Sequence, residues 1–127
     1  MKQDNEATKL IRLAERDWAA FRVLRDSDEV DASTAFFHAQ QCVEKCLKAV
    51  LVFHKQRVPK IHDLLGLVEL VGKFTAIPVS DSDLNSLTPY AVEFRYNEVD
   101  FYTIDNKFAT WIVETIFTWA KEVIGSE

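Results

Sequence analysis

A stripe of polar side chains interrupts a strongly apolar segment in the first half of the chain. Gln41, Glu44, Lys45 and Lys48 share one face of a helix predicted over residues 32–55, since positions three, four and seven apart point the same way. Glu44 and Lys48 are spaced for an ion pair along the helix. The stripe is either a solvated outer face or one wall of a ligand cleft.

His38, Cys42 and Cys46 lie four residues apart on a neighbouring face of the same helix. Soft ligands at this spacing could bind zinc, but three ligands surrounded by small side chains are more typical of a buried core. A disulfide between two cysteines on one rigid helix would be strained. We therefore expect both cysteines to be reduced and free of metal, as in a reducing compartment.

Two further pairs of residues could contribute to a site. His62 and Asp63 begin a short predicted helix, where Asp63 could cap the helix or pair with the imidazole. Arg95 and Tyr96 lie among several carboxylates, and Arg95 could pair with one of these or hold a phosphate. No glycine-rich phosphate loop, paired catalytic carboxylates or Ser-His-Asp arrangement is identifiable.

The elements that position these residues follow from apolar periodicity and from the scarcity of turn residues, with three Gly and three Pro in 127 residues. Long helices are predicted over about residues 4–26, 32–55, 81–97 and 104–124, with a short helix over 63–72. Asp81 or Ser82 could cap the third long helix, which Pro89 should kink, with Thr88 as the cap of the restart. The expected fold class is all-α: a single domain over residues 1–127, forming an up-and-down four-helix bundle with a short extra helix.

Composition limits the possible partners and the compartment. The net charge of −5 argues against non-specific nucleic-acid binding, although a local basic cleft would be compatible with it. No apolar run approaches the ~20 residues that span a bilayer, and polar residues follow Met1 through Lys9, so we expect a cytoplasmic protein without membrane contact. Nine Phe and three Trp predict an aromatic core. Trp111 and Trp119 share a face that a small core would not cover fully, which predicts a homodimer.

Three pieces of the chain together resemble a known family. They are the segment from Phe36 to Ala49, which reads FFHAQQCVEKCLKA, then Ile61-His62-Asp63-Leu64, and then Leu87-Thr88-Pro89 leading to Arg95-Tyr96. Over about residues 10–123 the chain is similar to the HEPN domain (higher eukaryotes and prokaryotes nucleotide-binding). The resemblance implies a helical bundle, often dimerised through the face that bears the motifs. Prokaryotic members are often encoded beside a minimal nucleotidyltransferase in a toxin–antitoxin-like pair, and many members are metal-independent ribonucleases.

The resemblance assigns site positions residue by residue. The chain itself departs from the nuclease pattern after Arg95. The positions that match the motifs are Gln41, Glu44, Lys48, His62, Asp63, Arg95 and Tyr96. Nuclease members carry a His shortly after the Arg, where this chain has Asp100, Phe101 and Tyr102. Asn97 also stands where near relatives usually have Pro. His62 could replace the missing His if the fold brings it to Arg95.

These observations favour a binding module over an enzyme. The preferred hypothesis is a HEPN-like homodimer that binds a nucleotide or a minimal nucleotidyltransferase partner, without cofactor or metal. In it, Gln41, Lys48, His62 and Arg95 converge on one cleft between the second and fourth long helices, and Tyr96 stacks on a base. One alternative is a metal-independent ribonuclease toxin that acts on RNA with Arg95 and His62. The other is a purely structural bundle for protein assembly.

Overall fold

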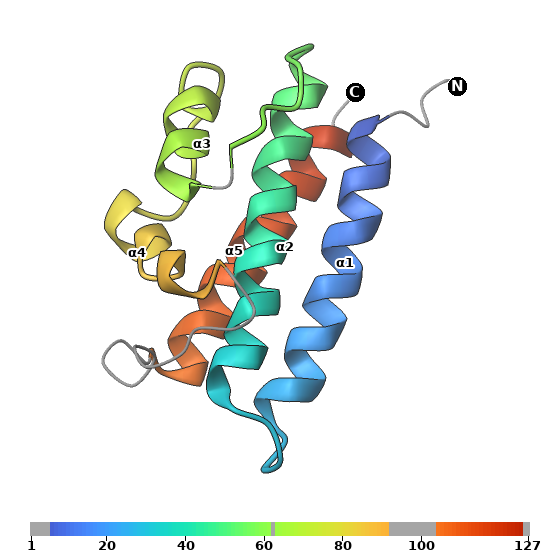
Figure 1. Cartoon of the computed structure of the whole chain (residues 1–127). Helices are drawn as coiled ribbons and strands as arrows, with labels where there is room; N and C mark the ends of the chain where they lie inside the picture. Colours follow the sequence, from blue (N-terminus) through green and yellow to red (C-terminus); the bar gives the residue numbers. More distant parts are fainter. Residues whose placement is uncertain (1–5, 62, 92–103, 126–127) are drawn as a thin grey trace.

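The chain forms a bundle of helices. The computed structural model describes residues 6–61, 63–91 and 104–125. In chain order these residues form α1 (Glu6–Arg25), α2 (Ala32–Phe53), α3 (Leu64–Val71), α4 (Asp81–Asn85), a 3-10 helix η1 (Thr88–Tyr90) and α5 (Asn106–Gly125). The described residues contain no strand. The predicted all-α bundle is confirmed (Figure 1).

Helix α2 lies at the centre of the bundle. It packs most extensively against α1, and it also contacts α5, α3 and η1 (Figure 1). Its buried face toward the core includes small side chains at Ala35, Ala39, Cys42, Cys46 and Ala49. Small side chains allow a neighbouring helix to approach closely, which accounts for the extensive α1–α2 contact. No helix of the described segments is both long enough and apolar enough to pass through a bilayer.

An aromatic series runs through the core from α1 to η1. The ring of Trp18 stacks at 6.1 Å from Phe21, which lies 6.3 Å from Phe36 on α2. Phe36 in turn meets Tyr90 of η1 edge-on at a centroid distance of 5.2 Å. Phe21, Phe36 and Tyr90 are fully or almost fully buried, so the expected aromatic core is present.

The long kinked helix predicted over residues 81–97 is replaced, in its described part, by α4 and η1. Helix α4 is capped by Ser80, whose hydroxyl accepts from the Asp83 amide at 3.1 Å, rather than by Asp81 or Ser82. It stops after one turn, where the Ser86 hydroxyl donates to the Asp83 carbonyl at 2.6 Å. Such side-chain bonds compete with continued helix, and Pro89 removes a backbone donor. Thr88 lies inside η1 instead of capping it, and residues 92–97 lie outside the described residues.

Helix α5 is rotated relative to the predicted stripe. Apolar periodicity places Phe108, Trp111, Ile112, Thr115, Ile116, Trp119 and Val123 on one side of this helix. Of these, Ile112 and Ile116 are buried, and Phe108, Trp119 and Val123 are partly buried against the core. The other buried residues of the helix come from the adjoining stripe: Ala109, Val113, Phe117 and Ala120. Trp111 is 45% exposed. Two apolar stripes adjoin on this helix, and the stripe with the small alanines faces the core because it permits closer packing.

Candidate functional site

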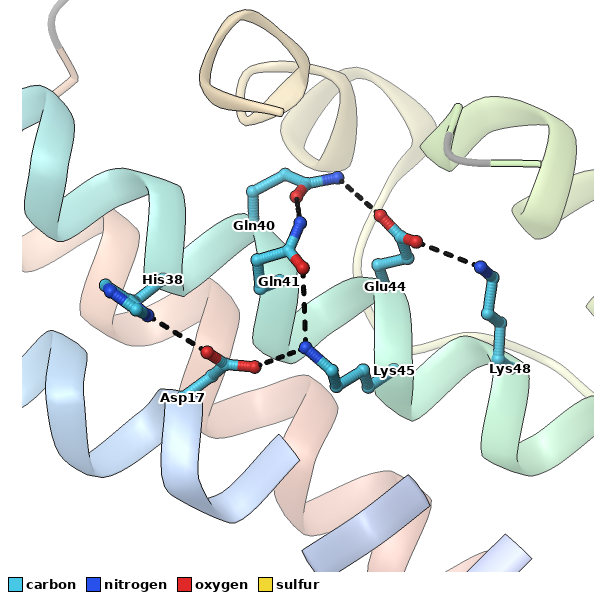
Figure 2. A network of polar contacts seen from close by, with 7 residues as sticks. All are labelled: Asp17, His38, Gln40, Gln41, Glu44, Lys45 and Lys48. Carbon is cyan, nitrogen blue, oxygen red and sulfur yellow. Dashed lines mark hydrogen bonds and ion pairs between the residues drawn. The ribbon is translucent and has the colours of Figure 1, made fainter. Parts of the chain in front are cut away.

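Seven polar side chains form one continuous network along α2 and the facing side of α1 (Figure 2). Hydrogen bonds and ion pairs connect each of them to the next. We call this group the α2 polar network; it consists of Asp17, His38, Gln40, Gln41, Glu44, Lys45 and Lys48.

One half of the network is buried. Gln40 is 0% exposed, Glu44 5% and Lys48 8%. The Lys48 Nζ donates to Glu44 Oε2 at 3.0 Å, and the Gln40 Nε2 donates to Glu44 Oε1 at 3.1 Å. Charged groups are costly to bury unless they are paired and hydrogen-bonded, and this pair meets both conditions. The solvated-face interpretation is therefore wrong for Glu44 and Lys48.

The other half of the network lies nearer the surface, between α1 and α2. Asp17 of α1 accepts from Lys45 Nζ at 2.7 Å through Oδ2, and its Oδ1 lies 3.0 Å from His38 Nδ1. Gln41 joins the two halves: its Nε2 donates to Gln40 Oε1 at 2.7 Å, and its Oε1 accepts from Lys45 at 3.3 Å. The result is an unbroken polar path from His38 to Lys48.

Comparison with known families decides the family of the chain. A model of the HEPN domain matches residues 7–125. The chain belongs to the HEPN family. No curated protein matches it, and no solved structure does. Gln41, Glu44 and Lys48, which the resemblance assigned to motif positions, are members of one hydrogen-bonded network in this HEPN domain.

The remaining predicted site residues fall into two groups. Asp63 is the N-cap of α3, and its Oδ1 accepts from the Leu65 amide at 3.3 Å, so the capping interpretation is confirmed. His62, Arg95 and Tyr96 lie outside the described residues. The convergence of these residues on Gln41 and Lys48 thus stays a prediction. Among the described residues, the network member that lies outside α2 is Asp17 of α1.

Two members of the network were missed by sequence reasoning about the site. Gln40 lies at helical spacing from the apolar residues Phe36 and Val43, and a lone amide in such a stripe is a signal that it needs a buried partner. Asp17 gave no local signal, because its partners lie on a different helix. His38 was grouped with the cysteines, but its ring turns to the Asp17 carboxylate.

The two cysteines of this HEPN domain are buried free thiols. Hydrogen bonding to Cys46, with burial as the second cause, raises the pKa of the Cys42 thiol well above its usual range. A thiol that keeps its proton is a poor nucleophile and a poor metal ligand. Within the described residues, no cluster of three or more His, Cys, Asp or Glu could hold a metal ion.

The network combines a buried ammonium, paired with a carboxylate, and two side-chain amides, which are groups that recognise polar ligands through hydrogen bonds. Lys48 supplies an ammonium group in a largely water-excluded position, where charge–charge interactions are stronger than in bulk solvent. Glu44 holds that ammonium in place and can accept hydrogen bonds from a base or a sugar. Gln41 offers an amide at the intermediate position between the buried half and the surface.

Proposed function

We propose that this HEPN domain binds a nucleotide, or the nucleotide-bearing site of a minimal nucleotidyltransferase partner, without catalysis by its own side chains. The observation that carries the proposal is the buried Glu44–Lys48 pair, which Gln40 joins to Gln41. The resemblance assigned Gln41, Glu44 and Lys48 to motif positions of the family. A core helix gains little stability from a buried ion pair compared with apolar side chains. A binding role explains why the pair is placed there.

The phosphate of the nucleotide would contact the Lys48 ammonium, which is also paired with Glu44. Arg95 would donate two hydrogen bonds to the same phosphate. Tyr96 would stack on the base, as the family resemblance implies. Binding is favoured over nuclease activity because the positions after Arg95 that would carry the nuclease His hold Asp100, Phe101 and Tyr102. The proposed setting is a cytoplasmic homodimer beside a nucleotidyltransferase, in a toxin–antitoxin-like pair.

A titration with a nucleotide panel tests the proposal at Arg95. The Arg95→Lys substitution keeps the charge but removes the planar fork that holds two phosphate oxygens. We expect a loss of about 1–3 kcal/mol, which corresponds to an increase of roughly fivefold to 150-fold in the dissociation constant. Isothermal titration calorimetry on purified protein measures it.

The matched control is Lys107→Gln, which removes an exposed cation at the start of α5. This control should bind the nucleotide like the wild type. Equal nucleotide affinity of wild type and Arg95→Lys would show that Arg95 does not hold the phosphate. Metal-independent cleavage of RNA that His62→Ala abolishes would favour the ribonuclease alternative instead.

A further inference from the structure

The end of the bundle beyond α2 carries a cluster of cations. The segment after α2, residues 54–61, contains Lys55, Arg57 and Lys60 and has no Asp or Glu. The turn after α3 adds Lys73, and all four side chains are exposed. Both segments lie at the same end of the molecule (Figure 1). We call this group, together with Phe74, the basic end.

Ring stacking joins the two segments of the basic end. The imidazole of His54 stacks on the ring of Phe74 with centroids 5.1 Å apart and an interplanar angle of 15°. The ring of Phe53 meets the same imidazole edge-on at 5.2 Å. Phe74 remains 42% exposed. One face of Phe74 is thus supported by His54, while a large part of the residue is open to solvent.

The cations of the basic end differ from those of the α2 polar network in their pairing. Lys45 and Lys48 are each within ion-pair distance of a carboxylate. In the described part of the chain, Lys55, Arg57, Lys60 and Lys73 have no such carboxylate neighbour. In a chain of net charge −5, the basic end is therefore a local concentration of cations that take no part in the ion pairs of the described residues.

We propose that the basic end is a docking surface for single-stranded nucleic acid. The four cations would contact backbone phosphates, and one base would stack on the open face of Phe74. A cationic surface with an exposed aromatic ring is the combination that single strands recognise, whereas an anionic membrane would require a larger apolar surface to insert. None of Lys55, Arg57, Lys60, Lys73 and Phe74 is a residue of the proposed nucleotide site, so the two proposals are tested by different substitutions.

Fluorescence anisotropy with labelled RNA and DNA oligonucleotides of about twelve nucleotides tests the proposal on the full chain. The double variant Arg57→Gln/Lys60→Gln should weaken binding about tenfold at low salt and flatten the dependence on salt concentration, because fewer counterions are released. Phe74→Leu should weaken binding about threefold to tenfold and leave the salt dependence unchanged. Comparison of RNA with DNA shows which strand is preferred.

The matched control is Lys9→Gln/Arg16→Gln, which removes two exposed cations of α1 and should bind like the wild type. Circular dichroism verifies that each variant is folded. The proposal is overturned if Arg57→Gln/Lys60→Gln binds like the wild type, if the control weakens as much, or if the protein binds phosphatidylserine vesicles but no oligonucleotide. Oligonucleotide binding that depends on Arg95 and not on Arg57 or Lys60 would place the strand on the α2 face and also overturn it.

Discussion

Glu44 and Lys48 show what the spacing of two residues on a helix can predict and what it cannot. Their spacing predicted an ion pair, and the pair is present with an N–O distance of 3.0 Å. Spacing did not reveal their burial, because burial depends on which elements cover that face of α2. Gln40 illustrates the reverse case, in which a polar residue in an apolar stripe is fully buried and satisfied by Glu44.

The first residue-scale prediction concerns Lys48. The change to Met removes the ammonium from beside the buried Glu44 carboxylate, so we expect the free energy of unfolding to fall by about 2–3 kcal/mol. Urea denaturation monitored by circular dichroism measures it. The double variant Glu44→Gln/Lys48→Met should be less destabilised than the sum of the single variants. Strict additivity would show that the two side chains do not interact energetically.

The second residue-scale prediction concerns pH and Cys42. The pKa of Cys42 is raised in the folded state, so the folded protein keeps its thiol proton while the unfolded chain loses it at alkaline pH. This contribution to stability is complete below the unfolded pKa of about 8.5, and it is lost as pH rises toward the folded pKa. Denaturation from pH 7 to about 10 should show a smaller decline for Cys42→Ala than for the wild type. Parallel declines would contradict the assignment.

At the scale of elements, the C-terminus of α2 contains an avoidable conformational strain. Lys55 has a φ of 68°, in the left-handed region that favours glycine, and its amide donates to the Val52 carbonyl at 2.8 Å. Lys55→Gly should raise the free energy of unfolding by about 0.5–1 kcal/mol, because glycine adopts this conformation without a steric penalty. Thermal denaturation tests it. Lys55→Ala is the control, since it keeps the Cβ and should give no such gain.

Elements differed in how well the sequence predicted them. Helices α1, α2 and α3 were predicted within a few residues, because long apolar periodicities and the Asp63 cap are local signals. The segment from residue 81 was not, since Ser86 and Thr88 bond to neighbouring groups in a way that periodicity does not encode. The rotation of α5 also escaped prediction, because the choice between two apolar stripes is made by packing against α2.

For the whole molecule, the net charge does not describe how charge is distributed over the surface. The net charge of −5 argues against non-specific nucleic-acid binding but is compatible with a local basic surface, and the basic end concentrates cations in the segments after α2 and after α3. The α2 polar network also needs a residue from a second helix: Asp17 lies on α1, and the other members lie on α2. Asp17 joins the network, and Lys73 and Phe74 join the basic end, through tertiary placement, which a linear pattern does not contain.

The last prediction concerns assembly and the outer face of α5. Trp111 is 45% exposed, and its ring stacks on Phe108 with centroids 6.2 Å apart. Large aromatic rings on a surface gain free energy when a partner covers them, and we expect a second copy of this chain to do so. Sedimentation velocity at micromolar concentration should show a dimer for the wild type and a monomer for Trp111→Gln. Phe74→Gln is the matched control, because it removes another exposed aromatic ring outside this face and should stay dimeric. A monomeric wild type would argue against self-association. A dimer that persists in Trp111→Gln would move the interface away from α5, toward the face that bears the HEPN motifs.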